Sequence, residues 1–200
     1  MTASKRLPRA QREQQMLDAA VGVFSRNGFH GSSMDDIAEV AMISKPMLYL
    51  YLGSKEELFA ACITREAQRF VDAVISSADV SLAPREQLDR GVLAFFTFVA
   101  ENCDSWLVLY RQARSEAPFA QQVVAGRAQV ALVVSQLLQR TNPHGLDAAY
   151  FDAVAFALVG AGEALADRML DEEEPDPRAS ATLLVELAWH GLAGARPAAR

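Results

Sequence analysis

The chain contains two cysteines among its 200 residues, Cys62 and Cys103. They are far apart and belong to no CxxC pair, which excludes a cysteine-based zinc site and a disulfide scaffold and favours a reducing intracellular setting. No apolar run approaches the roughly 20 residues that span a bilayer, and the basic N-terminus lacks a signal-peptide core. We therefore expect a cytoplasmic protein with no membrane partner.

Signals of catalysis and metal binding are also missing. His30, His144 and His190 stand far apart with no HxxE companion, so we expect no metal site. No nucleophile elbow or glycine-rich phosphate loop occurs, and the acidic run Asp171 to Glu174 is typical of a solvated loop. We expect no catalytic residue and no cofactor, and an enzyme is a poor interpretation.

The net charge of −6 at first argues against a nucleic-acid partner. Residues 1–56 nevertheless hold seven Lys or Arg against six Asp or Glu, which leaves net −7 for the remainder. The first twelve residues carry Lys5, Arg6, Arg9 and Arg12 with no acid. Because a phosphate backbone responds to the local field, overall acidity does not exclude DNA.

Hydrophobic periodicity predicts an all-α protein, since no alternating strand pattern lasts long and Pro and Gly fall mainly at boundaries. An apolar fraction of 51% is ample for a core. We expect helices over 9–27, from 34 to a turn at 41–43, 44–52, 55–77, 84–103, 104–114, 116–141, 146–172 and 176–194. We divide the chain into an N-terminal domain, 1–54, and a larger helical domain, 55–200.

Residues 33–58 have the signals of a helix-turn-helix. Ser33 with Asp36 and Ser54 with Glu57 are capping boxes, each opening a helix. Ser44 is expected to cap the helix between them, where Pro46 is tolerated in the first turn. Leu48 and Leu52 should face inward, Lys45, Met47, Tyr49 and Tyr51 should lie on or near the outer side, and Gly53 should end the helix.

This pattern resembles the TetR family of bacterial transcriptional regulators, whose N-terminal pattern is similar to AAxxxFxxxGFxxxSMDDIAxxAxxSKxxLYxYxxSKEEL in this chain. The matching positions are Ala19, Ala20, Phe24, Gly28, Phe29, Ser33 to Ala38, Ala41, Ser44, Lys45, Leu48, Tyr49, Tyr51, Ser54, Lys55 and Leu58. Met42 departs from the glycine usual at the turn and must adopt a left-handed conformation or alter the turn. Leu52 and Met47 also differ from the family, so base preference does not transfer from relatives.

The resemblance implies that 44–52 lies in the major groove of DNA. Phosphate or base contacts are expected from Lys5, Arg6, Arg9, Ser33, Ser44, Lys45, Met47, Tyr49, Tyr51 and Lys55. Lys45 could bond a guanine edge or a phosphate, Met47 offers apolar contact, and the tyrosine hydroxyls suit phosphate. In the alternative, Tyr49 is a packing aromatic.

Specific reading of paired half-sites requires two heads, so we expect a homodimer. The last two helices carry apolar stripes, and their predicted interface residues are Phe151, Val154, Leu158, Gly162, Leu184, Leu187, Ala188 and Gly191. Four such helices would form an isologous bundle like those of the family. In the alternative, the stripes belong to the core of one chain.

The middle helices concentrate aromatic residues and a few polar ones, which favours a cavity for a small apolar effector. The predicted ligand-binding residues are Phe95, Phe96, Val99, Asn102, Trp106, Tyr110, Arg114 and Arg127. This segment resembles that of lipid-responsive TetR regulators, so the effector could be a fatty acyl compound. A purely structural aromatic core is the alternative.

Together these observations predict a ligand-responsive transcriptional regulator. We expect a repressor that binds a palindromic operator as a homodimer and is released by its effector. An activator, or a regulator whose ligand strengthens DNA binding, stays open. From another class, a helical lipid carrier without specific DNA binding also stays open.

Overall fold

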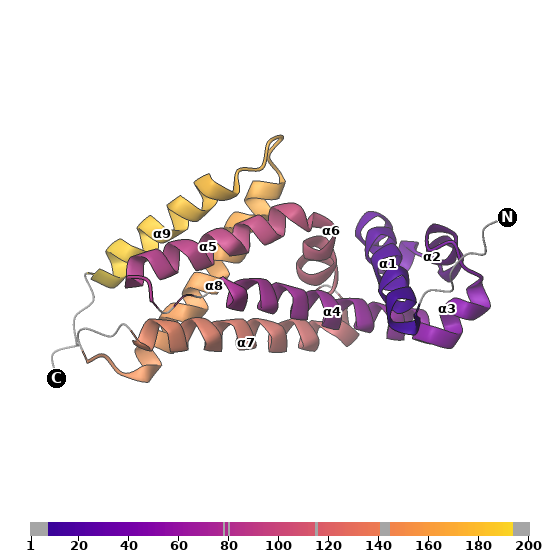
Figure 1. Ribbon diagram of the computed structural model, residues 1–200, viewed down its shortest axis with the longest axis horizontal. Helices are drawn as coiled ribbons and strands as arrows, with labels where there is room; N and C mark the ends of the chain where they lie inside the picture. The colour runs from indigo at the N-terminus through magenta and orange to yellow at the C-terminus, as the bar shows by residue number, and fades with distance from the viewer. Residues whose placement is uncertain (1–7, 78, 80, 115, 141–144, 194–200) are drawn as a thin grey trace. The chain divides into compact units, whose positions relative to one another are not determined.

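The computed structural model describes residues 8–77, 79, 81–114, 116–140 and 145–193, and every regular element in these ranges is helical (Figure 1). The elements are α1 (Arg9–Gly31), α2 (Met34–Val40), α3 (Lys45–Leu52), α4 (Lys55–Ser76), α5 (Pro84–Glu101), α6 (Cys103–Trp106), the π-helical segment η1 (Leu107–Gln112), α7 (Ala117–Arg140), α8 (Ala148–Leu170) and α9 (Pro177–Ala193). The predicted all-α class is confirmed. Most predicted helix bounds agree to within about three residues.

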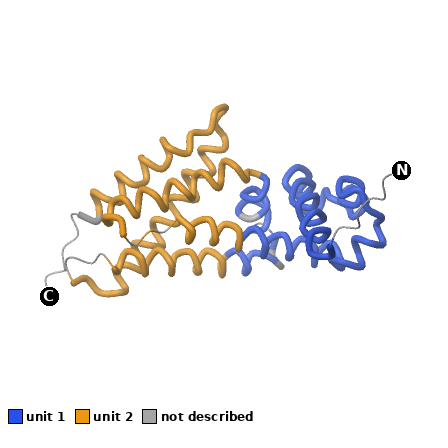
Figure 2. The backbone as a smooth tube through the Cα atoms, in the orientation of Figure 1, with its two compact units in different colours: residues 1–67, 104–123 blue, residues 68–103, 124–200 orange. Residues whose placement is uncertain are grey.

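The chain forms two compact units (Figure 2). Unit 1 contains residues 1–67 and 104–123, and unit 2 contains residues 68–103 and 124–200. Helices α4 and α7 therefore each begin in unit 1 and end in unit 2. The functional division at residues 54 and 55 stays a prediction, because compactness does not define function.

Unit 1 is built around a group of aromatic side chains. Phe59 of α4 has no exposed surface. Its ring centre lies 4.8 Å from that of Phe24, 5.0 Å from that of Phe29 and 4.8 Å from that of Phe119. Such ring pairs add about 0.5–1.5 kcal/mol each beyond burial. This cluster holds the C-terminal part of α1 and the N-terminal ends of α4 and α7 together.

The helix-turn-helix begins with the predicted capping box. The Ser33 hydroxyl accepts from the Asp36 N–H at 3.1 Å, and the Asp36 carboxylate accepts from the Ser33 N–H at 3.1 Å. Met42 has φ 53°, so the predicted left-handed residue at the turn is confirmed. Ser44 is the N-cap residue of α3, as predicted, but its side chain makes no capping hydrogen bond, and Pro46 lies in the first turn.

Two glycines of unit 1 have positive φ and offer a matched test of strain. Gly28 (φ 73°) interrupts α1, and Gly53 (φ 69°) ends α3. A Cβ on Gly28 meets nothing within 4 Å, whereas a Cβ on Gly53 would lie 2.1 Å from Glu57 Oε2. That oxygen accepts the Ser54 N–H at 2.7 Å, and Ser54 Oγ accepts the Glu57 N–H at 3.1 Å, so the second capping box is present.

We expect Gly28→Ala to lower the free energy of unfolding by about 1–3 kcal/mol through backbone strain alone. Gly53→Ala should lose about 1 kcal/mol more, because Glu57 must leave the Ser54 N–H. Urea unfolding of the two variants measures the difference. Equal losses would contradict the role assigned to the Gly53–Glu57 approach.

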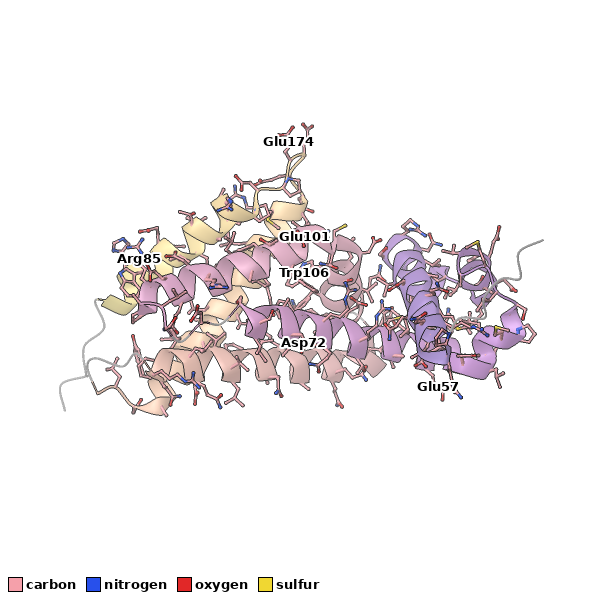
Figure 3. All side chains as sticks on the ribbon, viewed as in Figure 1. Glu57, Asp72, Arg85, Glu101, Trp106 and Glu174 are labelled. Atoms are coloured by element: carbon pink, nitrogen blue, oxygen red, sulfur yellow. The ribbon has the colours of Figure 1, made fainter. Side chains whose placement is uncertain are left out.

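The segment after α5 departs from the predicted regular helix over 104–114. It contains one turn of α-helix, α6, followed by the π-helical η1. Trp106, which Figure 3 labels, is buried. Its ring stacks on that of Tyr110 with 3.8 Å between ring centres. The Trp106–Tyr110 spacing of four residues is common to α-helix and cannot reveal a widened turn.

Unit 2 contains α5, α8, α9 and most of α7. Helix α5 packs along α9 and also contacts α8, which packs on α9. Arg85 lies at the start of α5, where Figure 3 labels it. It bonds Glu186 of α9, and its guanidinium carbon lies 5.9 Å from the Trp189 ring centre. A smaller buried cluster joins Phe70, Phe98 and Val130. Unit 2 therefore has its own core.

Helix α8 overturns the expectation that no apolar stretch is long enough to span a bilayer. By length and composition α8 passes that test, with mean hydropathy 1.4 in an 18-residue window of which 22% is buried. The apolar character of α8 is difficult to recognise in the sequence because charged residues such as Asp152 and Glu163 interrupt it. Between them the residues are mainly Ala, Val, Leu and Phe. Most of this apolar window is therefore not buried within the single chain.

Candidate nucleic-acid interface

Helix α3 is the candidate reading element, and its core-facing side is well defined. Leu48 and Leu52 are 0% and 9% exposed and belong to the unit 1 core, as predicted. Tyr49 is 46% exposed, so a solvent-facing tyrosine stands where DNA contact was predicted. Met47 is half-buried against the core, and only part of its side chain can reach a partner.

Lys45, at the first position of α3, pairs with α2. Its Nζ lies 2.8 Å from Asp35 Oδ2, and both side chains are exposed. This hydrogen bond to Asp35 raises the pKa of Lys45 above its ordinary value. The ammonium therefore stays charged, and it must exchange the carboxylate for a phosphate or base before contacting DNA.

Arg9 and Tyr51 form a contact between α1 and α3. The Arg9 guanidinium carbon lies 5.3 Å from the Tyr51 ring centre, and Tyr51 is half-buried against the core. Tyr51 is thus less exposed than its predicted outer position implies. Stacking on the ring orders the exposed Arg9 side chain, which is suited to a phosphate contact.

The other predicted phosphate ligands differ in availability. Lys55 donates to the carbonyls of Phe29 at 2.9 Å and Ser32 at 3.1 Å and lies 4.5 Å from the Phe29 ring centre. Its ammonium is therefore bound to the connection between α1 and α2 and is less available to a phosphate. Ser33 is engaged in its capping box, and Ser44 is exposed. Lys5 and Arg6 lie outside the described residues.

Two residues of α3 with no predicted role are exposed to solvent. Leu50 is 78% exposed, and Pro46 is also exposed. Helical spacing could have indicated both positions. Leu48 and Leu52 define the buried side, Leu50 is midway between them and so faces away, and Pro46 is one turn before Leu50. The turn residue Met42 is 91% exposed.

The predicted effector residues divide between the two units. Trp106, Tyr110 and Arg114 belong to unit 1, and the remaining five belong to unit 2, so they do not form one cluster within either unit. The unit 2 members are Phe95, Phe96, Val99, Asn102 and Arg127. Phe96 and Val99 are fully buried, and the Asn102 side chain accepts from Arg69 at 2.9 Å and donates to the Phe98 carbonyl at 2.9 Å.

An ion pair lies inside unit 2 between α7 and α8. Arg127 Nε is 3.2 Å from Glu163 Oε1, and Glu163 is buried. The Arg127 guanidinium carbon also lies 4.7 Å from the ring centre of Phe156. A Cβ on Gly160 would come within 2.9 Å of Arg127, so this glycine makes room for the cation. A charged pair in such surroundings is a candidate anchor for a polar group.

The predicted interface residues fall into two groups. Phe151, Gly162, Leu184 and Ala188 are buried within the chain itself, and Val154 and Leu158 are half-buried. Leu187 and Gly191 are exposed, Leu187 at 64%. The exposed apolar residues of α8 are others, namely Ala153, Phe156, Ala157 and Ala164. On α9 they are Leu183, Leu187 and Gly191.

Neither cysteine supports a reactive site. Cys62 is fully buried, and burial raises the pKa of its thiol to about 12, so it stays protonated. Cys103 is exposed, and both are free thiols. Within the described residues, no group of three or more His, Cys, Asp or Glu side chains is arranged to hold a metal ion.

Two family models match the chain. The model described as bacterial regulatory proteins, tetR family, matches residues 16–62, and the model described as tetracyclin repressor-like, C-terminal domain, matches residues 84–191. The first spans the helix-turn-helix, most of α1 and the start of α4. The second runs from α5 into α9 and includes all of the effector and interface candidates.

Relatives extend the likeness over most of the chain. The transcriptional activator FasR of Mycolicibacterium smegmatis is 32% identical over 94% of this chain and 85% of its own length. A TetR-like regulator from Rhodococcus sp. RHA1 has a solved structure with TM-score 0.81 and 54% identity, covering 95% of this chain and 100% of that one. FadR of Bacillus subtilis, solved in complex with stearoyl-CoA, has TM-score 0.69 and 21% identity over 88% of this chain and 96% of its own, a likeness of fold alone.

Proposed function

This chain belongs to the TetR family of bacterial transcriptional regulators, and from that premise we propose that it binds a palindromic operator as a homodimer under the control of a small apolar effector. The family and the relatives are DNA-binding regulators, not enzymes. The observation that carries the proposal is α3, which presents an exposed side beside two confirmed capping boxes.

The charged and hydroxyl groups around α3 supply the proposed phosphate contacts. Four of the predicted contact residues are exposed on or beside α3, the helix that would enter the major groove. They are Lys45 and Tyr49 of α3, its N-cap residue Ser44, and Arg9 of α1. Such contacts fix register without specifying sequence. Four other predicted residues contact unit 1 itself, so we assign them to positioning the helix. They are Ser33, Met47, Tyr51 and Lys55. Lys5 and Arg6 remain proposed ligands of the backbone.

The exposed apolar side of α8 and α9 supports the proposed homodimer. Phe156, Leu183 and Leu187 are 57%, 44% and 64% exposed. A second copy of the same face would bury them and form a four-helix bundle around a two-fold axis. Of the interface residues predicted from the sequence, this proposal retains Leu187 and Gly191. On α8 it replaces the predicted residues with Phe156 and its exposed small neighbours.

Unit 2 supplies the proposed effector region. Phe95 packs against Phe70 and Phe96 with ring centres 5.6 Å and 4.8 Å apart, and Gly162 brings α8 close to Phe95. Arg127, paired with Glu163 of α8, offers a cation in the same unit. An acyl chain with an anionic end group suits both features, and the stearoyl-CoA of the FadR neighbour has that chemistry.

Control of DNA binding is proposed to run through α4, which begins in unit 1 and ends in unit 2. An effector that binds one arrangement of the two reading heads more tightly changes DNA affinity, and DNA changes effector affinity by the same factor. Action on chromosomal DNA implies a cytoplasmic protein. We propose a repressor that its effector releases from DNA, and the alternative is an activator, as the FasR relative is named.

The proposal is tested by selecting DNA bound by the full chain from a random pool at a stated salt concentration. We expect a palindrome with two half-sites centred about one helical turn or a multiple apart. Recovery of no preferred sequence, with affinity near the non-specific level of roughly 10⁻⁴ to 10⁻⁶ M, would contradict it and favour the lipid carrier.

Effector response is tested by titrating stearoyl-CoA or oleate into the protein–operator complex in a mobility-shift assay, with free coenzyme A as control. We expect operator affinity to change by about 5- to 150-fold. Release indicates a ligand-relieved repressor, and tighter binding indicates the alternative mode. An acyl compound that binds without altering DNA affinity would defeat the proposed coupling.

A further inference from the structure

The outermost line of α3 consists of two apolar residues. Successive residues of an α-helix advance by about 100°, so Leu50 lies about opposite the buried Leu48 and Leu52. Pro46, four residues earlier, is on the same side as Leu50. Leu50 is 78% exposed and Pro46 is exposed, which agrees with this placement.

This outward line has no side-chain hydrogen-bonding group. Reading of guanine or adenine by paired hydrogen bonds uses Arg, Lys, Asn or Gln, and Lys45 is the only one of these in α3 (KPMLYLYL). The Lys45 ammonium lies 2.8 Å from Asp35 Oδ2. The one base-edge feature of the major groove that an apolar side chain recognises well is the C5-methyl group of thymine.

Exposed apolar side chains of unit 1 gather in this region. Among its described residues, the large apolar or aromatic side chains that are strongly exposed all fall between residues 40 and 50. They are Val40, Met42, Tyr49 and Leu50. Strong exposure of apolar side chains within one helix-turn-helix agrees with their burial against a partner. The family membership identifies duplex DNA as that partner.

We propose that Leu50 is a specificity-determining residue that packs on a thymine methyl group in each operator half-site, with Pro46 beside it. This inference rests on the proposed function and deepens it by naming the base chemistry that the operator must offer. Burial of an otherwise exposed leucine against a methyl group favours the complex. Phosphate contacts from other residues then set register and not sequence.

The test removes single methyl groups from the selected operator. Each thymidine of a half-site is replaced in turn by deoxyuridine, which lacks only the C5-methyl group, and affinity is measured by fluorescence anisotropy at fixed salt. We expect one position to lose about fourfold in affinity when that methyl is removed. Other positions should change by less than twofold.

Protein variants then assign that methyl group to Leu50. Because the homodimer carries the substitution in both subunits, Leu50→Ala should bind the thymine operator about sixteenfold more weakly, about fourfold for each half-site. It should no longer distinguish thymine from uracil there. Leu50→Met should retain the distinction. Leu132→Ala, at a leucine of α7 that is 52% exposed, is the matched control and should behave as the parent protein.

Two outcomes would overturn the inference. In one, no thymine of the half-site responds to loss of its methyl group. In the other, Leu50→Ala keeps the full response. Failure of the proposed function has a different signature, because no preferred operator is then recovered at the selection step. Circular dichroism verifies folding, which a substitution at so exposed a site should leave unchanged.

Discussion

Leu187→Arg is expected to separate the homodimer and to weaken operator binding by about a hundredfold or more. Leu187 is 64% exposed on α9, and Leu183 lies one turn away on the same side. In a two-fold interface each substitution places two new charges near one another in an apolar layer. A monomer then binds a single half-site. It loses the gain in affinity that comes from linking two binding sites, a factor of about 10² to 10⁴.

The prediction is measured by light scattering for mass and by mobility shift for affinity. Because Leu187 is exposed in the single chain, the variant should keep its helical content, and circular dichroism establishes this. Leu132→Arg adds the same charge at an exposed leucine of α7 and should stay dimeric with full affinity. A Leu187→Arg protein that remains a dimer with parental affinity would exclude this face as the interface.

The helix-turn-helix could be predicted from sequence because its signals are local. Capping boxes join residues three apart, and the left-handed Met42 follows from a turn that usually holds glycine. The outward position of Leu50 also follows from Leu48 and Leu52. Roles set by distant neighbours could not be predicted: the Lys55 ammonium bonds carbonyls 26 and 23 residues away.

The exposed side of α8 could not be predicted, for a different reason. Helical periodicity locates a buried face only when the opposite face is polar. In α8 every position from Ala153 to Gly162 is Ala, Val, Phe, Leu or Gly, so the pattern does not orient the helix. Burial then showed that Phe151 and Gly162 face the chain's own core while Phe156 faces solvent.

Arg65→Ala is expected to lower the free energy of unfolding by about 3–5 kcal/mol, the usual loss when one partner of a buried ion pair is removed. Glu66 has no exposed surface, and Arg65 Nε donates to its Oε1 at 2.6 Å. Arg65 Nη1 also donates to Asp18 Oδ1 at 2.7 Å and to the Gln14 carbonyl at 3.2 Å. The arginine thus connects α4 to α1 within unit 1, directly before the unit boundary.

Two further variants separate the buried charge from the lost α1 contacts. Glu66→Gln in the Arg65→Ala background replaces the carboxylate with a neutral amide, which is less costly to bury, so part of the stability should return. Arg168→Ala is the matched surface control, since the Arg168 side chain is 70% exposed beside Glu172 and its pair should contribute less than about 1 kcal/mol.

Urea unfolding of the single and double variants gives the coupling energy between Arg65 and Glu66. We expect the two substitutions to be non-additive, with the double variant more stable than Arg65→Ala. Losses that add without coupling would show that Arg65 acts only through Asp18 and Gln14. Because α4 continues from this pair into unit 2, destabilisation here should also weaken the effector response, which the mobility-shift titration measures on the same proteins.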